Sequence, residues 1–246
     1  MSKELHYKNS PLTEAVIDLQ VTVSEEVTLE ALASMQSEQK HSYPTRRDQM
    51  YVEGQFSVDP ETPPASGIRT QRGYAFLSDD ERQIFQARLD GFTFSRLAPY
   101  ENWESFRDEA RRLWTVYRAI TKPQKINRLA VRYINRLDLP LPFDDFNQYL
   151  RTVPVVSPEL PQALNSYFMQ LQIPYEDLSA TLILNQALLP LTDPDKVPIL
   201  LDIDIFRDTD MAEGEESIWE FFEKLRSRKN DVFEACITEQ MKELIR

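Results

Sequence analysis

Two stretches of the sequence resemble each other: Trp103-Glu104-Ser105-Phe106 and Trp219-Glu220-Phe221-Phe222, which lie 116 residues apart. The same register places Val116, Tyr117 and Ala119 over Val232, Phe233 and Ala235. At a shift of 115 residues, Ala15-Val16-Ile17 falls on Ala130-Val131-Arg132. Because a repeat of this length carries its own strands and helices, the pattern indicates two copies of one supersecondary unit.

The first unit is expected to contain a strand, a helix, three further strands and a closing helix. Alternation of apolar and polar residues predicts the first strand over residues 14–21 and the later strands over residues 50–58, 68–77 and 82–97, with a loop over residues 60–67. A capping residue and apolar positions at helical spacing predict helices that begin near Thr28 and near Asn102.

The second unit is expected to repeat this order. Strands are predicted over residues 126–139, 167–175, 178–189 and 197–207, with a short helix over residues 144–150 and a final helix from about Ser217. The predicted fold class is therefore α+β, with two tandem strand-helix-three-strand-helix units, residues 1–122 and 123–246, that form antiparallel sheet with helices packed on one face. Together the two units are expected to make one compact domain.

Composition excludes several classes of protein. Hydrophobic residues make up 41% of the 246 residues, which is ample for a sizeable core. The apolar runs are too short to span a bilayer, so no membrane partner and a cytoplasmic location are expected. The single Cys236 and the two distant histidines, His6 and His41, offer neither a disulfide nor a zinc site.

Charge is distributed unevenly along the chain, whose net charge is -12. Residues 1–39 carry a net charge of -5, residues 40–136 of +5 and residues 137–246 of -12. An acidic total disfavours nucleic acid as a partner, because phosphate binding needs many lysines and arginines. The basic middle third nevertheless leaves room for an anion site, and the acidic third for a basic partner.

The strand over residues 126–139 is the best candidate for a binding site. Alternation places Arg132 and Arg136 on one face, where they and Arg88 are expected to bind a phosphate or a carboxylate. Tyr133 and Asn135, on the other face, are further candidate ligand-binding residues, although Asn135 also suits a core amide. The alternative for the arginines is a ladder of ion pairs with Asp202 and Asp204. As exposed residues, Arg132 and Arg136 are expected to contribute ~1 kcal/mol or less to stability.

Asp202 and Asp204 form the second candidate site. They lie two residues apart on one strand, so both carboxylates are expected on the same face, where they could bind a hard cation such as magnesium. A metal-dependent phosphoesterase would use such a pair together with an arginine clamp. The alternative is the polar outer face of an amphipathic strand.

Aromatic residues at helical spacing are expected to be core rather than base-stacking platforms: Trp103, Trp114, Tyr117, Trp219 and Phe233. Phe92 and Phe94 are expected to be exposed, because Phe85, Ala87 and Leu89 would fill the opposite face of the strand over residues 82–97. Such exposed rings would suit a partner protein or a homodimer interface. Cys236, on the apolar side of the last helix, is predicted to be a buried, unreactive thiol.

Two resemblances add to this interpretation. The duplicated order of elements resembles the TATA-box-binding protein and related helix-grip folds. Residues 9–16, Asn-Ser-Pro-Leu-Thr-Glu-Ala-Val, together with residues 128–136, which contain Arg-Tyr-Ile-Asn-Arg, are similar to an uncharacterised prokaryotic family of similar length and sporadic distribution. That distribution implies phage defence or toxin–antitoxin modules.

Together, these sequence features favour a non-enzymatic binding protein that binds a partner protein or a small anionic ligand on its sheet face and serves as a defence-associated or toxin-neutralising module. No cofactor is expected for that function. The alternatives are the magnesium-dependent phosphoesterase that uses the aspartate pair and, less favoured by charge, a nucleic-acid binder.

Overall fold

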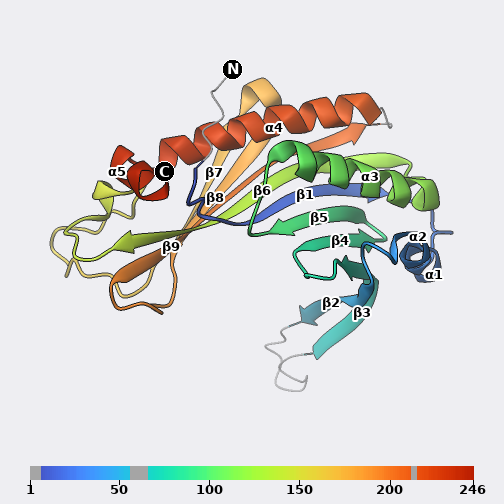
Figure 1. Ribbon diagram of the computed structural model, residues 1–246, viewed down its shortest axis with the longest axis horizontal. Coiled ribbons are helices and arrows are strands. Elements are labelled where there is room, and N and C mark those ends of the chain that lie inside the picture. Colours follow the sequence, from blue (N-terminus) through green and yellow to red (C-terminus); the bar gives the residue numbers. More distant parts are fainter. Residues whose placement is uncertain (1–6, 56–65, 212–214) are drawn as a thin grey trace.

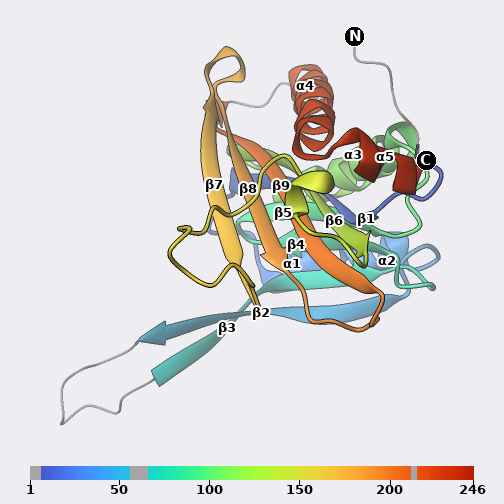
Figure 2. The same ribbon diagram turned by 90° about the vertical axis from the view of Figure 1, so that its left-hand side faces the viewer.

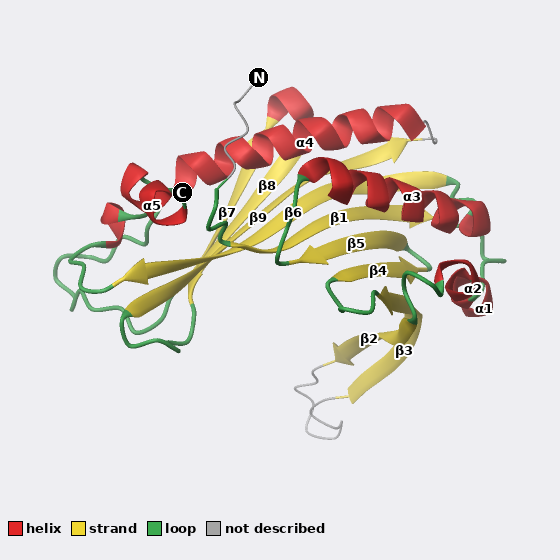
Figure 3. Ribbon diagram, viewed as in Figure 1, coloured by secondary structure: helices red, strands yellow, loops and turns green. Residues whose placement is uncertain are grey.

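The computed structural model describes residues 7–55, 66–211 and 215–246, and its main feature is one antiparallel sheet (Figures 1 and 3). The strands are β1 (Leu12–Thr22), β2 (Thr45–Gln55), β3 (Ser66–Leu77), β4 (Gln83–Arg88), β5 (Gly91–Leu97), β6 (Lys125–Pro140), β7 (Phe168–Tyr175), β8 (Ala180–Leu188) and β9 (Lys196–Met211). These nine strands lie in the order β2-β3-β4-β5-β1-β6-β9-β8-β7. The sheet is open, with β2 and β7 as its edges.

The pairing of β1 with β6 lies at the centre of the sheet. The two strands are antiparallel, and Ile17 lies opposite Val131. Alternate residues of β1, including Ala15, Ile17 and Leu19, are fully buried. Because β1 opens the first half of the chain and β6 opens the second, this pairing joins both halves in one sheet and one hydrophobic core.

Within the described residues, five α-helices pack against this sheet or against each other, and two short 3-10 turns lie in the connections. They are α1 (Leu29–Ala33), α2 (Met35–Gln39), α3 (Trp103–Thr121), α4 (Glu215–Cys236) and α5 (Glu239–Ile245), with 3-10 turns η1 (Phe146–Gln148) and η2 (Glu176–Leu178). α4 packs on β6 and β9, α3 on β5, and α1 on β3 and α3. Figure 1 shows α5 at the opposite end of the sheet from α1 and α2, and Figure 2 shows the β2–β3 hairpin projecting from the body.

The two long helices form where their sequences predict. The side chain of Asn102 accepts a hydrogen bond from the backbone N–H of Ser105 at 2.8 Å and thereby caps α3. The apolar stripe of α3 is buried, and so are Ile218, Phe222 and Leu225 of α4. Cys236 is buried as predicted, and burial raises the pKa of its thiol to about 11. A protonated, enclosed thiol is a poor nucleophile.

The predicted fold class is wrong, because the two halves do not form tandem units of one design. Residues 82–97 are not one strand but the β4–β5 hairpin, so the described residues of the first half contribute five strands. Residues 144–150 contain the short turn η1, so no α-helix separates β6 from β7. A single open sheet results instead. The order of elements on which the helix-grip resemblance rests is therefore not the order in the structure.

The β4–β5 turn is the local cause of this difference. Arg88 pairs with Gly91, so the chain reverses at Leu89 and Asp90. A side chain at Gly91 would place its Cβ 2.5 Å from the backbone oxygen of Leu19, so glycine is needed for the close approach of the hairpin to β1. The Asp90-Gly91 pair is a turn signal that the longer apolar alternation obscures.

The expected exposure of Phe92 and Phe94 is also wrong, since both are buried. The reversal at Asp90 restarts the alternation, which puts both rings on the core side. Phe92 packs against Phe85 and Trp114, and the ring centroid of Phe94 lies 5.3 Å from that of Phe106. The predicted strand over residues 50–58 begins earlier, at Thr45; its last three residues and most of the predicted loop over 60–67 lie outside the described residues.

Replacing Ile17 with Ala is expected to destabilise the protein by about 2–5 kcal/mol, because it leaves a cavity between the two central strands. Gln20→Ala changes an exposed position on the same strand and is expected to alter stability by no more than about 0.5 kcal/mol. Urea unfolding followed by tryptophan fluorescence measures both. Equal effects of the two substitutions would show that the β1–β6 pair is not the centre of the core.

Candidate functional site

Strand β6 divides its polar residues between two surfaces. Arg128 and Arg132 lie on the sheet face away from α4, where they meet carboxylates of β1 and β9. Tyr133 and Asn135 lie on the opposite side and line a pocket beneath α4. The residues predicted as one ligand-binding set are therefore separated by the sheet.

The sheet face away from α4 carries a network of ion pairs between arginines and aspartates. Arg132 binds Asp202 through two hydrogen bonds, with Nε–Oδ1 and Nη2–Oδ2 distances of 2.8 and 2.7 Å. Asn185 of β8 donates a third hydrogen bond to the same carboxylate at 3.0 Å. The hydrogen bonds to Asp202 are the main reason that the pKa of Arg132 is raised. Asp202 is 2% exposed, so these partners replace nearly all of its water.

The network continues across the centre of the sheet. Arg128 lies between Asp18 and Asp204, at 3.4 and 3.0 Å, and its guanidinium stacks over Phe206. Arg88 donates to Asp18 from the other side at 3.1 Å. Burial raises the pKa of Asp204 despite Arg128, and its Oδ1 is buried without a hydrogen-bond partner in the described part of the chain.

These contacts favour the ladder of ion pairs over a free anion site. Arg88 and Arg132 already bind carboxylates, and Arg136 lies apart from them, bound to Asp138 at 2.9 Å and Thr192 at 3.3 Å. Asp202 and Asp204 face the same side, as predicted, but each binds a different arginine. Within residues 7–55, 66–211 and 215–246, no group of three or more His, Cys, Asp or Glu side chains could hold a metal ion.

The pocket beneath α4 has a volume of about 940 Å³. Its floor is β6, one wall is α4, and the other walls are residues 7–12 and the connection from β5 to α3. The backbone N–H of Asn9 donates to the carbonyl of Ile245 at 2.9 Å, which ties residues 7–12 to α5. The charged and titratable side chains of the lining are Tyr7, Lys8, Tyr100, Glu101, Tyr133, Arg226, Lys229, Asp231 and Glu234.

Lys229 is the chemically distinctive residue of this pocket. Its Nζ lies 3.7 Å from the centroid of the Tyr133 ring, and within the described residues it forms no hydrogen bond or ion pair. The side chain is half-buried where it borders the pocket, and its amine lies against the ring of Tyr133. This burial, assisted by the charge of Arg226 and opposed by that of Glu234, lowers the pKa of Lys229 to about 7.

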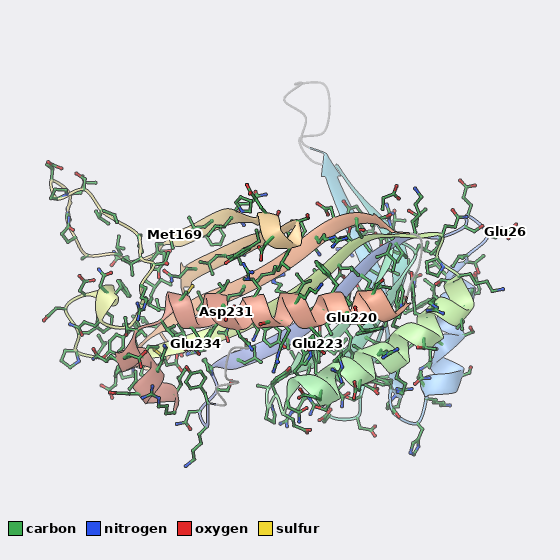
Figure 4. All side chains as sticks on the ribbon, turned by 90° about the horizontal axis from the view of Figure 1, so that it is seen from above. Glu26, Met169, Glu220, Glu223, Asp231 and Glu234 are labelled. Carbon is green, nitrogen blue, oxygen red and sulfur yellow. The ribbon has the colours of Figure 1, made fainter. Side chains whose placement is uncertain are left out.

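The acidic neighbours of Lys229 are bound elsewhere. Glu234 accepts a hydrogen bond from Tyr7 at 2.6 Å and pairs with Lys242 at 3.0 Å. Glu223 accepts from Trp103 and from Arg107 of α3. Figure 4 shows Glu223, Asp231 and Glu234 spaced along α4. Asp231 is exposed at the surface. Among the described residues, the lysine therefore lacks the anionic partner that a buried ammonium normally has.

Tyr133 and Asn135 have fixed positions in the pocket floor. The hydroxyls of Tyr100 and Tyr133 lie 3.0 Å apart, and burial raises the pKa of both phenols. Asn135 donates to the carbonyl of Leu201 at 3.0 Å, so it serves as a core amide as well as a lining residue. Tyr133 and Asn135 are therefore hydrogen-bonded and uncharged side chains of the floor.

Sequence reasoning missed Lys229, although a signal for it exists. The buried stripe of α4 consists of Phe222, Leu225, Val232 and Cys236. Lys229 lies four residues after Leu225 and three before Val232, so it belongs to the same helical stripe. A lysine at such a position is either paired or perturbed. The residues that close the pocket around it come from distant parts of the chain, which no periodicity indicates.

No protein-family model matches the chain, and no curated protein is significantly similar to it. The resemblance of residues 9–16 and 128–136 to a sporadic prokaryotic family stays a prediction. In the part of the chain that the structure describes, no helix is long and apolar enough to cross a membrane.

The structure changes the expected energetic role of Arg132. Arg132→Ala would leave the buried Asp202 with Asn185 as its remaining side-chain partner, so we expect a loss of about 2–3 kcal/mol of stability. Arg136→Ala removes an exposed ion pair from the same strand and should cost about 0–1 kcal/mol. Denaturant titration of both variants checks the difference. A near-neutral Arg132→Ala would mean that water replaces the guanidinium without penalty.

Replacing Lys229 with Met should stabilise the protein most at low pH. The amine has a pKa of about 7 in the folded protein and a higher ordinary value when unfolded, so protonation favours the unfolded chain. Below pH 7 the wild type therefore bears the full cost in folding stability of holding a protonated amine in this pocket. That cost decreases as the pH rises from about 7 and is gone above the ordinary lysine pKa. Melting temperatures of Lys229→Met and wild type should converge between about pH 7 and 10. A constant difference across this range would refute the burial of a charged amine.

Proposed function

We propose that this protein binds a small organic anion in the pocket beneath α4. The observation that carries the proposal is Lys229, a half-buried side chain whose amine has no carboxylate partner among the described residues, in a pocket of about 940 Å³. A buried charge is costly unless an opposite charge lies beside it. A carboxylate, sulfonate or phosphate of a ligand would supply that charge.

The pocket lining supports an organic rather than an inorganic anion. Tyr100 and Phe233 are partly exposed in the lining and offer ring surface to a ligand. Arg226 places a second cation in the lining, 5.9 Å from the Trp103 ring centroid. Apolar walls with a few convergent polar groups are typical of small-molecule sites. A ligand with a flat apolar body and one acidic group fits both features.

This proposal keeps the predicted class of small-anion binder and moves the site to the other side of β6. The charges of the sheet face are already compensated by each other, so an anion there would have to displace Asp202 from Arg132. The magnesium-dependent phosphoesterase is disfavoured for the same reason, since both aspartates are bound to arginines. A partner protein, a homodimer, a cytoplasmic location and a toxin-neutralising or defence role stay predictions.

Binding of 8-anilinonaphthalene-1-sulfonate, followed by fluorescence, tests the proposal, because its sulfonate stays charged at every pH used. One molecule should bind per chain, and affinity should be highest below pH 7, where Lys229 is protonated, and fall as the pH rises through about 7. N-phenyl-1-naphthylamine lacks the sulfonate and is the neutral control, whose binding should depend little on pH.

Lys229→Met should weaken binding of the sulfonate probe by about tenfold or more, the equivalent of ~1.4 kcal/mol, because it removes the buried cation. Lys224→Met, at an exposed position of the same helix, should have no effect. Equal affinity and equal pH dependence in wild type and Lys229→Met would place the anion elsewhere.

A further inference from the structure

The geometry of the pocket points to a second property of Lys229. We propose that its amine is a nucleophile that captures a small aldehyde or ketone as an imine inside the pocket. This inference rests on the proposed function, because the carbonyl compound must enter the same pocket as the anion. It adds the chemical class of the ligand and a covalent step.

The amine is positioned for attack. It projects from α4 over the Tyr133 ring at 3.7 Å, and that ring is itself held by the hydrogen bond between the hydroxyls of Tyr133 and Tyr100. A nucleophilic nitrogen needs a lone pair that no hydrogen-bond donor or acid engages, and Lys229 forms no hydrogen bond or ion pair within the described residues. By contrast, Lys242, which lies nearby, is bound to Glu234 and Glu239.

The protonation state of Lys229 suits this chemistry. The groups that set it are Arg226, whose charge disfavours the ammonium, and Glu234, whose charge favours it; the tyrosines of the pocket are neutral. With a pKa lowered to about 7, a far larger fraction of this amine is unprotonated near neutral pH than of an ordinary lysine, which is almost fully protonated there. Desolvation beside another cation is a recognised way to activate a lysine toward carbonyl compounds.

The reaction balances without any oxidant or reductant. The nitrogen lone pair adds to the carbonyl carbon, the π electrons of the C=O bond move to oxygen, and a proton passes from nitrogen to that oxygen. The carbinolamine then loses its hydroxyl group and the remaining N–H proton as water, and a C=N bond forms. One amine and one carbonyl give one imine and one water.

The test uses 4-carboxybenzaldehyde, which carries an aromatic ring, an acidic group and an aldehyde, together with sodium cyanoborohydride to trap the imine. The chain has nine lysines, so the site of attachment is informative. Intact mass and peptide mapping should show one adduct, at Lys229, formed at least about tenfold faster than at Lys224 at pH 7.5. Its rate should rise with pH up to about pH 7 and not beyond, because the amine is then largely unprotonated and no longer attracts the carboxylate of the probe, whereas exposed lysines react faster up to much higher pH.

Two controls make the result decisive. Lys229→Arg keeps the positive charge and removes the nucleophile, so it should abolish the fast adduct, whereas Lys224→Arg should leave it unchanged. If Lys229→Arg fails to fold, the pH–rate profile and the peptide map of the wild type decide. Labelling spread evenly over the lysines, or a Lys229 rate that still rises at pH 10, would overturn the inference.

The alcohol 4-(hydroxymethyl)benzoate separates this inference from the proposed function, because it has the same ring and acid but no carbonyl. If the alcohol binds to the wild type and binds more weakly to Lys229→Met, while the aldehyde forms no imine, the anion site stands and the covalent step is wrong. If neither compound binds, the proposed function fails and the inference fails with it.

Discussion

The pairing of β1 with β6 is the interaction on which the rest of the structure depends. It unites the two halves of the chain in one sheet, and it fixes which side of each strand faces the core. A shift of one residue in this register would exchange the two faces of β6, burying Arg132 and exposing Val131. The central apolar residues, Ile17 and Val131, are fully buried, so such a shift would be strongly unfavourable.

The same alternation places positively charged side chains in two different environments, one on each side of β6. On the outer face, register determines the pairing: Arg132 lies opposite Asp204 in the ladder, yet its side chain reaches diagonally to Asp202, which leaves Asp204 to Arg128. Each guanidinium thus has a carboxylate, and each can stay charged. Beneath α4 the amine of Lys229 lies against the Tyr133 ring and has no carboxylate partner in the part of the chain that the structure describes, so its charge is disfavoured.

Sequence patterns predicted the local elements better than their assembly. The alternation of β1 and β6, the buried stripes of α3 and α4, and the burial of Cys236 follow from periods of two and 3.6 residues, which local spacing reveals. The β4–β5 hairpin was missed because Phe85 and Phe94 belong to alternating apolar runs that together resemble one strand. The turn at Asp90 reverses the chain, so Phe92 and Phe94 face the core. The apparent repeat then suggested two units where one sheet forms.

The candidate site was harder to predict for a different reason. Arg132 and Asp202 were rightly expected on one face, but whether they bind a ligand or each other depends on cross-strand register, which no single sequence specifies. Lys229 interrupts an otherwise apolar stripe, yet its significance depends on Glu234 and Glu223 being bound to residues from distant segments. A charged residue in a buried stripe is therefore a signal in the sequence, but only the three-dimensional structure shows whether an opposite charge lies beside it.

Compensation of charge is what distinguishes the two faces as sites. An anion that approached Arg132 would compete with a buried carboxylate already held by two short hydrogen bonds, and displacing it would leave Asp202 uncompensated. An anion that entered the pocket would meet a cation whose burial has not been offset, and would relieve that cost on arrival. The electrostatics of the pocket beneath α4 therefore favour an anionic ligand more than those of the sheet face do. Attraction of an anion depends on positive charge that the protein's own carboxylates have not compensated.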